Sequence, residues 1–401
     1  MTLGRPWRWL RPLGQRYLAR FSQGTRPRTA GVVDFLLQDP GFRRAAQRHA
    51  RSLDVANWLC EPRQMQPVGK AAGWDIPTIE TVTDLASWLE IPLDALNSAA
   101  VPFATSHHYH YRLLSKQSGM LRLIEAPKPR LKALQRRIAA GILDCIPLHP
   151  AVHGFRHGHS IKTFAAPHAG QRVVLRMDLR DFFPTITRAR VQAFFRTAGY
   201  PEAVADMLGI LCTNSTPGSI WKPADPKLVP EMRALHRTPH LPQGAPTSPA
   251  LANLCAYRFD CRLSGLALAS GAFYTRYADD LAFSGDTDFE RSVDRFTTHA
   301  AAILMDEGFS VHHRKTRVMR RGVRQHLAGL VTNDIPNIYR GDYDRLKAIL
   351  TNCLRHGPAS QNRNGHPDFR AHLDGRISFV EMINPSKARK LRALFHQINW
   401  A

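Results

Sequence analysis

GAFYTRYADDLAF, residues 271–283, places two adjacent aspartates, Asp279 and Asp280, between two apolar segments rich in β-forming residues. Aromatic and alternating residues on both sides of a short polar turn predict a tight β-hairpin with both carboxylates at its tip. Adjacent carboxylates repel each other, so the pattern favours a site where a cation screens them. A site that holds Mg²⁺ against a triphosphate has this requirement. Residues 277–280 alone would be weak support, because aspartate is common in turns.

A third carboxylate, Asp178, lies near the end of an apolar, β-like segment, VVLRMDL at 173–179. Magnesium sites use a few carboxylates, waters and substrate phosphates instead of a closed protein cage. Asp178 and Asp279 on neighbouring strand ends could bridge two Mg²⁺ ions about 3.5–4 Å apart, with Mn²⁺ as an alternative metal and Leu179 in the same site. A single strand-end aspartate more often caps the next turn, but the two motifs together favour the metal site.

A loop rich in proline and glycine, LPQGAPTSP at 241–249, precedes a helical stretch. Gly244 permits a close approach of the backbone to a ligand. Ser248 followed by Pro249 predicts a helix N-cap and a first helical residue. A helix that begins in this way can support a nucleotide or a template strand.

In this order the three segments resemble the palm motifs of reverse transcriptases, and the similarity is closest to the retron type of bacteria. The resemblance extends from about residue 76 to the C-terminus through LRLIEAPKP at 121–129, the basic stretch 131–137, HGF at 153–155 with GHSI at 158–161, and the segments 307–316 and 324–333. It implies an α+β right-hand polymerase fold, with fingers, a palm of antiparallel strands and packed helices, and a helical thumb. The implied activity is that of an RNA-directed DNA polymerase.

Two retron signatures are altered in this chain. The family's Asn-Ala-x-x-His before the catalytic strand corresponds to FAAPH at 164–168, which keeps Ala165 and His168. The family's Val-Thr-Gly before the last palm strand corresponds to Leu327, Ala328 and Gly329. Because these regions are implicated in recognising a dedicated noncoding RNA in the family, the resemblance assigns RNA recognition to these five residues.

By motif position, the resemblance makes Asp178, Asp279 and Asp280 the catalytic carboxylates, with Asp178 and Asp279 doing most of the metal binding. Phe183 falls where the family places a bulky side chain under the sugar of the incoming nucleotide. A ring there would clash with a ribose 2′-hydroxyl and so favour dNTPs. Ordinary core packing beside Phe182 is the alternative.

The nucleotide-binding prediction has five members. Arg122 suits triphosphate oxygens because its guanidinium is a planar fork of donors. Lys116 is a second fingers candidate, and Gln243 and Gly244 belong to the loop described above. Lys315 stands where related polymerases place a basic residue that protonates the leaving pyrophosphate. A solvated surface charge is the alternative for both lysines.

Composition points to a polyanionic partner. The 401 residues carry 55 Lys and Arg against 32 Asp and Glu, a formal charge of +23. Such an excess favours phosphate contacts with template, primer and structured RNA, and a strong dependence on salt. An acidic membrane surface is the rival, but the sequence contains no apolar segment long enough to span a bilayer. The six cysteines form no C-x-x-C pair, which argues against a zinc finger or a disulfide framework.

We expect four regions: a basic N-terminal extension at 1–75, N-terminal helices and fingers at 76–170, a palm at 171–333 with a fingers insertion at about 191–242, and a helical thumb at 334–401. Residues 1–30 contain arginines and no acidic residue. They could form a basic arm that contacts nucleic acid, a disordered tail or a mitochondrial transit peptide. The bacterial resemblance favours the basic arm.

The retron resemblance further implies a structured noncoding RNA as template and primer, dNTPs as substrates, and a branched RNA–DNA product (msDNA). In the family this product commonly serves anti-phage defence with a separate effector protein, in the bacterial cytoplasm and without a membrane partner. A non-retron defence enzyme or a group II-like reverse transcriptase is the main alternative. An RNA-binding protein on a silent polymerase scaffold is the non-enzymatic one, and the three intact aspartates argue against it.

Overall fold

The computed structural model describes residues 8–21, 29–49, 64–100, 108–115, 121–221 and 229–400. The chain divides into two compact units, Met1–Gln64 and Met65–Ala401. The first unit contains the helices α1 (Leu10–Arg20), α2 (Thr29–Gln38) and α3 (Pro40–His49).

Aromatic packing and one ion pair hold the first unit together. The ring of Phe35 on α2 lies 5.7 Å from that of Tyr17 and 5.9 Å from that of Phe21. Arg16 on α1 pairs with Asp39 at 2.6 Å, just before α3 begins. The basic extension predicted from the sequence therefore contains a small helical unit.

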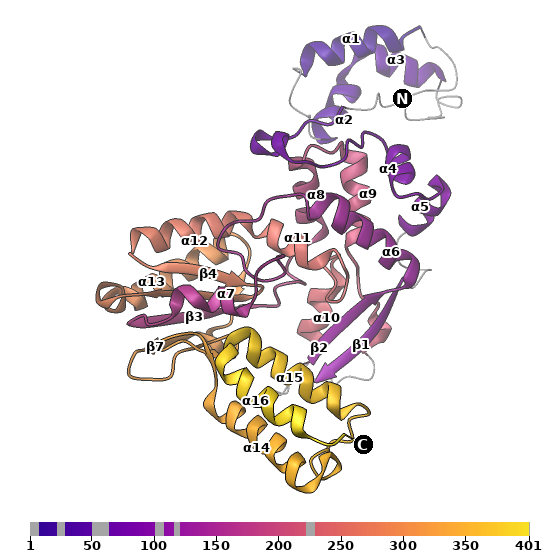
Figure 1. The fold of residues 1–401 in the computed structure, drawn as a ribbon. Helices are drawn as coiled ribbons and strands as arrows, with labels where there is room; N and C mark the ends of the chain where they lie inside the picture. The colour runs from indigo at the N-terminus through magenta and orange to yellow at the C-terminus, as the bar shows by residue number, and fades with distance from the viewer. Residues whose placement is uncertain are drawn as a thin grey trace. The chain divides into compact units, whose positions relative to one another are not determined.

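The second unit contains the other elements, which Figure 1 follows along the chain. Its helices are α4 (Val82–Trp88), α5 (Leu93–Ala100), α6 (Pro129–Ile138), α7 (Ile161–Ala165), α8 (Arg188–Thr197), α9 (Glu202–Cys212), α10 (Val229–Arg237), α11 (Ser248–Cys255), α12 (Tyr257–Ala269), α13 (Thr287–Asp306), α14 (Arg340–His356), α15 (Phe369–Ile383) and α16 (Pro385–Gln397). Its strands are β1 (Tyr109–Ser115), β2 (Leu121–Pro127), β3 (Val173–Arg180), β4 (Phe273–Tyr277), β5 (Asp280–Gly285), β6 (Ser310–Val311), β7 (Arg317–Arg320), β8 (His326–Leu327), β9 (Leu330–Val331) and β10 (Asn337–Ile338). Short 3-10 or π-helical turns are η1 (Gly69–Gly73), η2 (Ala139–Leu143), η3 (Ala166–His168), η4 (Gly218–Trp221), η5 (His313–Lys315) and η6 (Pro358–Ser360).

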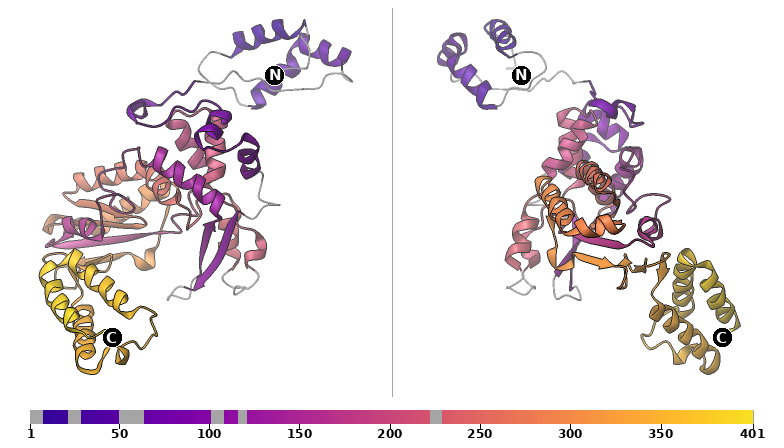
Figure 2. Two further views of the ribbon diagram at one scale, coloured as in Figure 1. Left: turned by 45° about the vertical axis from the view of Figure 1, so that its right-hand side comes forward. Right: turned by 90° about the vertical axis from the view of Figure 1, so that its left-hand side faces the viewer.

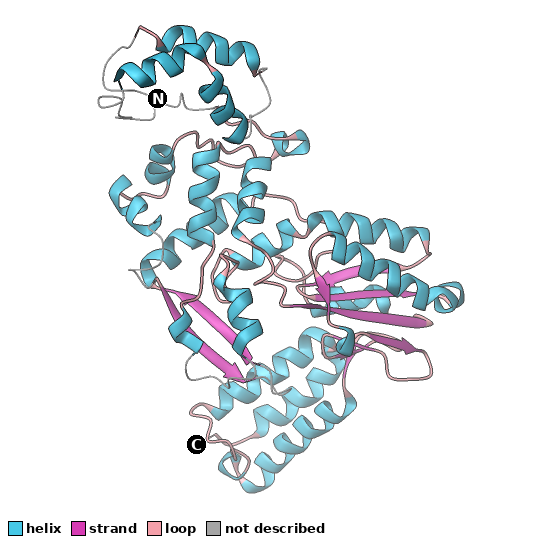
Figure 3. Ribbon diagram, turned by 180° about the vertical axis from the view of Figure 1, so that it is seen from behind, coloured by secondary structure: helices cyan, strands magenta, loops and turns pink. Residues whose placement is uncertain are grey.

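The central sheet has the strand order β4-β5-β3-β6, and β7 also pairs with β3. All of these pairings are antiparallel. Because side chains alternate along a strand, Leu175 packs in the core on one face, together with α12 and α13, while Val174 packs on the other with Phe164 of α7. Figure 3 shows α12 and α13 lying along the sheet. The segment 173–179, predicted to be β-like, is therefore a strand that is buried on both faces.

The β1–β2 hairpin and the helices α4, α5, α6, α8 and α9 form the region beside the sheet (Figure 1). The hairpin is antiparallel and runs in register from Tyr109 opposite Pro127 to Ser115 opposite Leu121. Helix α9 packs against α8 and contacts α4, α5 and α6. This region carries Arg122 on β2 and places it next to the end of the central sheet.

Helices α14, α15 and α16 form a bundle at the end of the chain, and Figure 2 shows it as a separate lobe joined to the sheet through the small sheet β10-β9-β8. Its core includes Leu350, Ile377 and Leu391, which are fully buried. The α+β fold predicted from the sequence, with an antiparallel palm sheet and a helical thumb, is confirmed. Among the described residues, no helix has both the length and the apolar character needed to cross a membrane.

Candidate active site

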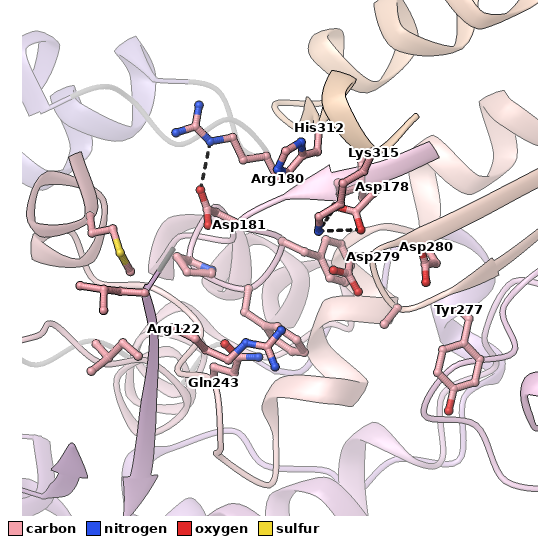
Figure 4. A pocket seen from close by; sticks show the side chains of 18 of the residues that line it. Arg122, Asp178, Arg180, Asp181, Gln243, Tyr277, Asp279, Asp280, His312 and Lys315 are labelled. Atoms are coloured by element: carbon pink, nitrogen blue, oxygen red, sulfur yellow. Dashed lines mark hydrogen bonds and ion pairs between the residues drawn. The ribbon is translucent and has the colours of Figure 1, made fainter. Parts of the chain in front are cut away.

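The β4–β5 hairpin places the paired aspartates as the sequence predicted. Tyr277 pairs with Asp280, which leaves Ala278 and Asp279 as a two-residue turn. Ala278 adopts a φ of 55°, the left-handed region that L-residues adopt at a cost. On the neighbouring strand, Asp178 lies opposite Asp280 in the β3–β5 register, and the amide of Leu179 donates to the carbonyl of Asp279 at 2.9 Å. The three carboxylates therefore meet at one end of the sheet (Figure 4).

Charges around the aspartates are unevenly compensated. Burial raises the pKa of Asp279, and the nearby charges of Asp178 and Asp280 raise it further. Burial also raises the pKa of Asp280, although Arg176 binds its Oδ1 at 2.6 Å and opposes the shift. Lys315 Nζ lies 2.8 Å from Oδ2 and 3.0 Å from Oδ1 of Asp178, as Figure 4 shows. The cluster is a carboxylate-rich site that a divalent cation would stabilise.

The donor chemistry fits Mg²⁺ or Mn²⁺, which prefer carboxylate oxygens and phosphate ligands. Within the described ranges, no three acidic, histidine or cysteine side chains converge into a preformed cage. Asp280, turned toward Arg176, is the least available of the three aspartates.

A buried network of charged and polar side chains connects the β4–β5 hairpin to α11 and α12. The guanidinium of Arg276, two residues before Ala278, binds both carboxylate oxygens of Asp260 at 2.8 and 2.7 Å, and both side chains are fully buried. Arg276 also donates to the carbonyl of Ala278 at 3.1 Å and to Asn253 at 3.0 Å. Asn253 in turn donates to the carbonyl of Gly154 at 2.9 Å. The turn is thereby held from α11 and α12.

The nucleotide side of the site comes from β2 and the Gln243 loop. Arg122 and Gln243 line the same cavity of about 420 Å³ as the aspartates, and Figure 4 shows both side chains beside it. The amide of Glu125 donates to the carbonyl of Gln243 at 2.9 Å. Gly244 has a φ of 130°, and a Cβ there would lie 3.0 Å from the carbonyl oxygen of Glu125. The close approach at Gly244 in this structure is to β2, and its contact with a ligand stays a prediction.

Most of the predicted catalytic and nucleotide-binding residues line this cavity: Arg122, Asp178, Leu179, Phe183, Gln243, Asp279, Asp280 and Lys315. Phe182 is buried in the core, whereas Phe183 is only partly buried and faces the cavity. Lys116 lies outside the described residues. Helix α11 begins at Ser248, one residue earlier than predicted, with Thr247 as N-cap. The Ser248 hydroxyl instead donates to the carbonyl of Pro242 at 2.7 Å and fixes the loop.

The five residues expected to recognise RNA divide into two groups. Ala165, His168 and Leu327 are fully buried, so their side chains do not reach a ligand at the surface in this structure. His168 bonds Ser284 on β5 and Thr275 on β4, each at 2.7 Å, and burial lowers its pKa to about 3.

Ala328 and Gly329 form the turn of the β8–β9 hairpin, with φ values of 45° and 83°. Positive φ at both central residues is the geometry of a type I′ turn. Ala328 lines the cavity that holds the aspartates, and Gly329 lies at a second hollow between this hairpin and the thumb. Direct contact with nucleic acid thus stays a prediction for this turn.

Several cavity residues were missed from the sequence. Arg180 and Asp181 follow Asp178 directly, and their place in the same segment was a usable signal. His312 also lines the cavity, and its amide donates to the carbonyl of Asp178 at 2.7 Å. Phe155, from the HGF segment, and Met232 reach the cavity from distant parts of the chain, and no local pattern indicated that Met232 would do so.

Comparisons with known proteins agree with this geometry. Residues 114–328 match the family described as "Reverse transcriptase (RNA-dependent DNA polymerase)". The chain is 41% identical to the Retron Mx65 reverse transcriptase of Myxococcus xanthus over 326 residues, which cover 80% of this chain and 72% of that protein. It is 36% identical to the Retron Mx162 reverse transcriptase of the same organism over 308 residues, 72% of this chain and 60% of that protein. Identity to the Retron Ec86 reverse transcriptase of Escherichia coli is 27% over 319 residues, 79% of this chain and 88% of that protein.

Proposed function

Because this chain belongs to the retron-type reverse transcriptases and is an RNA-directed DNA polymerase, we propose that Asp178 and Asp279 hold two divalent metal ions for nucleotidyl transfer. We further propose that the template and primer belong to one structured noncoding RNA. The observation that carries the proposal is the meeting of three aspartates with Arg122, Gln243 and Phe183 around one cavity of about 420 Å³.

Each residue has a defined task in this mechanism. Bound Mg²⁺ would lower the pKa of the attacking primer hydroxyl and neutralise charge on the triphosphate. Arg122 presents its planar guanidinium to the phosphates. Phe183 occupies the space that a ribose 2′-hydroxyl would need. Lys315, whose ammonium lies beside Asp178, would donate a proton to the departing pyrophosphate.

The similarity to retron reverse transcriptases supports a further proposal about product and partners. We propose that the enzyme copies part of its RNA into a branched RNA–DNA molecule, that this product serves anti-phage defence with a separate effector protein, and that it acts in the bacterial cytoplasm. The charge of +23 supports a large polyanionic partner. The altered segments 164–168 and 327–329 would then serve RNA binding mainly by shaping the β8–β9 turn and the palm behind it.

Primer extension on an RNA template tests the catalytic assignment. We expect Asp279→Asn to reduce extension at least about 10³-fold, equivalent to about 4 kcal/mol of barrier. Asp294→Asn, which removes an exposed carboxylate on α13, should leave the rate unchanged. Equal activity of wild type and Asp279→Asn would contradict the assignment.

Small nucleic acid from cells that express the gene with its upstream flank tests the retron assignment. We expect a discrete DNA band that requires Asp279 and whose mobility changes after RNase or debranching treatment. Primer extension by the purified protein without such a band in cells would instead indicate a bacterial reverse transcriptase of another class.

A further inference from the structure

A buried carboxylate lies behind the nucleotide side of the cavity, on a residue that the proposed mechanism does not use. Glu125 belongs to β2 and is 1% exposed. Because side chains alternate along a strand, Glu125 faces the interior while Arg122, three residues earlier, is exposed and reaches the cavity. A buried ionised carboxylate requires donors that compensate for its lost hydration.

Three side chains provide these donors. His240 Nε2 lies 2.9 Å from Oε2 of Glu125, while Asn214 Nδ2 and Thr216 Oγ1 donate to Oε1 at 2.7 and 2.8 Å. Burial alone would raise the pKa of Glu125, but the donors, His240 foremost, outweigh it and hold the pKa below its ordinary value. Glu125 is therefore ionised at neutral pH.

Both ring nitrogens of His240 face oxygen atoms. Nδ1 lies 2.7 Å from the carbonyl oxygen of Thr238, which only accepts, and Nε2 faces the ionised carboxylate of Glu125. His240 therefore bridges the carboxylate of Glu125 and the backbone of its own loop. The pair is a buried salt bridge, with exposed side-chain fractions of 0% and 1%. Loss of one partner would leave a buried charge without compensation.

This salt bridge joins the two segments that carry the nucleotide-binding side chains. His240 lies three residues before Gln243, and its backbone exchanges two hydrogen bonds of 2.9 Å with that of Asn214. On the other side, Glu125 lies three residues after Arg122. Its backbone amide donates a hydrogen bond to the carbonyl of Gln243 and so holds the loop against β2. The bridge therefore lies at the junction of β2 and the Gln243 loop.

We propose that the Glu125–His240 salt bridge positions the incoming nucleotide, by holding the strand of Arg122 and the loop of Gln243 so that both side chains reach one triphosphate. The inference rests on the proposed roles of Arg122 and Gln243. His236 extends the connection to the cavity, since it lines the cavity and its ring centroid lies 4.9 Å from that of His240. Binding groups need placement within about 0.5 Å to act together.

Steady-state primer extension with purified full-length enzyme tests the proposal. Glu125→Gln keeps the size of the side chain and removes its charge. We expect the dNTP KM to rise about tenfold or more while kcat at saturating dNTP stays within about threefold, because the triphosphate contacts are lost from the ground state and transition state alike. Glu290→Gln, which removes ion pairs to Arg172 at 2.8 Å and to Arg320 at 3.4 Å away from the cavity, is the matched control and should leave the KM unchanged.

A double-mutant cycle with Arg122→Ala separates positioning from general damage. If the bridge acts through Arg122, Glu125→Gln should change the KM of the Arg122→Ala enzyme by less than about threefold, because coupled residues are not additive. An undiminished increase in that background, or a fall in kcat without a rise in KM, would overturn the proposal.

Thr216→Val decides the matter if Glu125→Gln does not fold, because it removes one neutral hydrogen bond from the same carboxylate. We expect its dNTP KM to rise about two- to fivefold, and an unchanged KM would overturn the proposal. Activity that survives Asp279→Asn in an otherwise wild-type enzyme would refute the catalytic assignment instead. The two failures are therefore distinguishable.

Discussion

Gly154→Ala should disable the catalytic hairpin without touching a catalytic side chain. A Cβ on residue 154 would lie 2.5 Å from the amide nitrogen of Ala278 and 3.0 Å from the carbonyl carbon of Tyr277. Both atoms belong to the backbone of the turn, so no flexible side chain can give way. The added methyl group must therefore push the turn, and Asp279 with it, away from Asp178.

The size of the effect follows from this geometry. Ordinary van der Waals contact begins at 3.4 Å, so relief of a 2.5 Å contact requires a displacement of roughly 0.9 Å. A misplacement of about 1 Å at a reacting centre can cost about 10²-fold in rate. Overpacking costs about 1–3 kcal/mol of stability, which a domain of this size should survive. We therefore expect a folded protein whose kcat is reduced about a hundredfold.

Primer extension and thermal unfolding should be measured on the same preparations. Gly265→Ala is the matched control, because residue 265 is exposed on α12 and a Cβ there meets nothing within 4 Å. That control should keep full activity and gain about 0.5–1 kcal/mol of stability from the better helix propensity of alanine. A folded Gly154→Ala enzyme that keeps more than a third of the wild-type kcat would refute the reasoning.

Three further outcomes are expected. Phe183→Ala should lower the preference for dNTPs over rNTPs at least about tenfold in competition assays, because the ring that faces the cavity no longer occupies the 2′ position. His168→Gln should reduce the slope of unfolding free energy against pH by about 1.4 kcal/mol per pH unit between pH 4 and 6, as measured by urea denaturation. The sign follows because the folded pKa of about 3 lies below the unfolded value, so native stability falls as the pH is lowered through this range. Replacing the exposed Arg43, Arg44 and Arg48 of α3 with glutamine should make the RNA affinity less dependent on salt. If these arginines contact phosphates, the negative slope of the logarithm of the association constant against the logarithm of the salt concentration should become shallower by about 2.

The aspartates could be located from the sequence because their chemistry and their local pattern agree. A short polar turn between alternating residues predicts a hairpin tip, and an apolar segment predicts the buried strand that carries Asp178. The charged partners could not be located in the same way. Arg176 reaches Asp280 only because β3 and β5 pair in one particular register, and register depends on the whole sheet.

Local sequence patterns also did not predict the roles of buried polar residues. The position of His168 suggested contact with RNA, whereas in the structure this side chain ties η3 to β4 and β5. Glu125 belongs to the segment 121–129, from which the sequence analysis selected only Arg122. The partners of the Glu125 carboxylate lie 89 to 115 positions away along the chain. The role of a buried polar residue can be inferred only once its hydrogen-bond partners in the fold are known.

The basic side chains paired with two of the three aspartates explain how the site can fold before metal and substrate bind. Asp178 is paired with Lys315, a flexible side chain that is half exposed, at 2.8 Å. Asp280 is paired with Arg176, whose side chain is only 24% exposed. A half-exposed ammonium exchanges partners at little cost, whereas a largely buried guanidinium does so at a high one. Under the proposed roles, a metal ion would therefore replace Lys315 beside Asp178, whereas Arg176 would stay on Asp280 and keep the hairpin against β3.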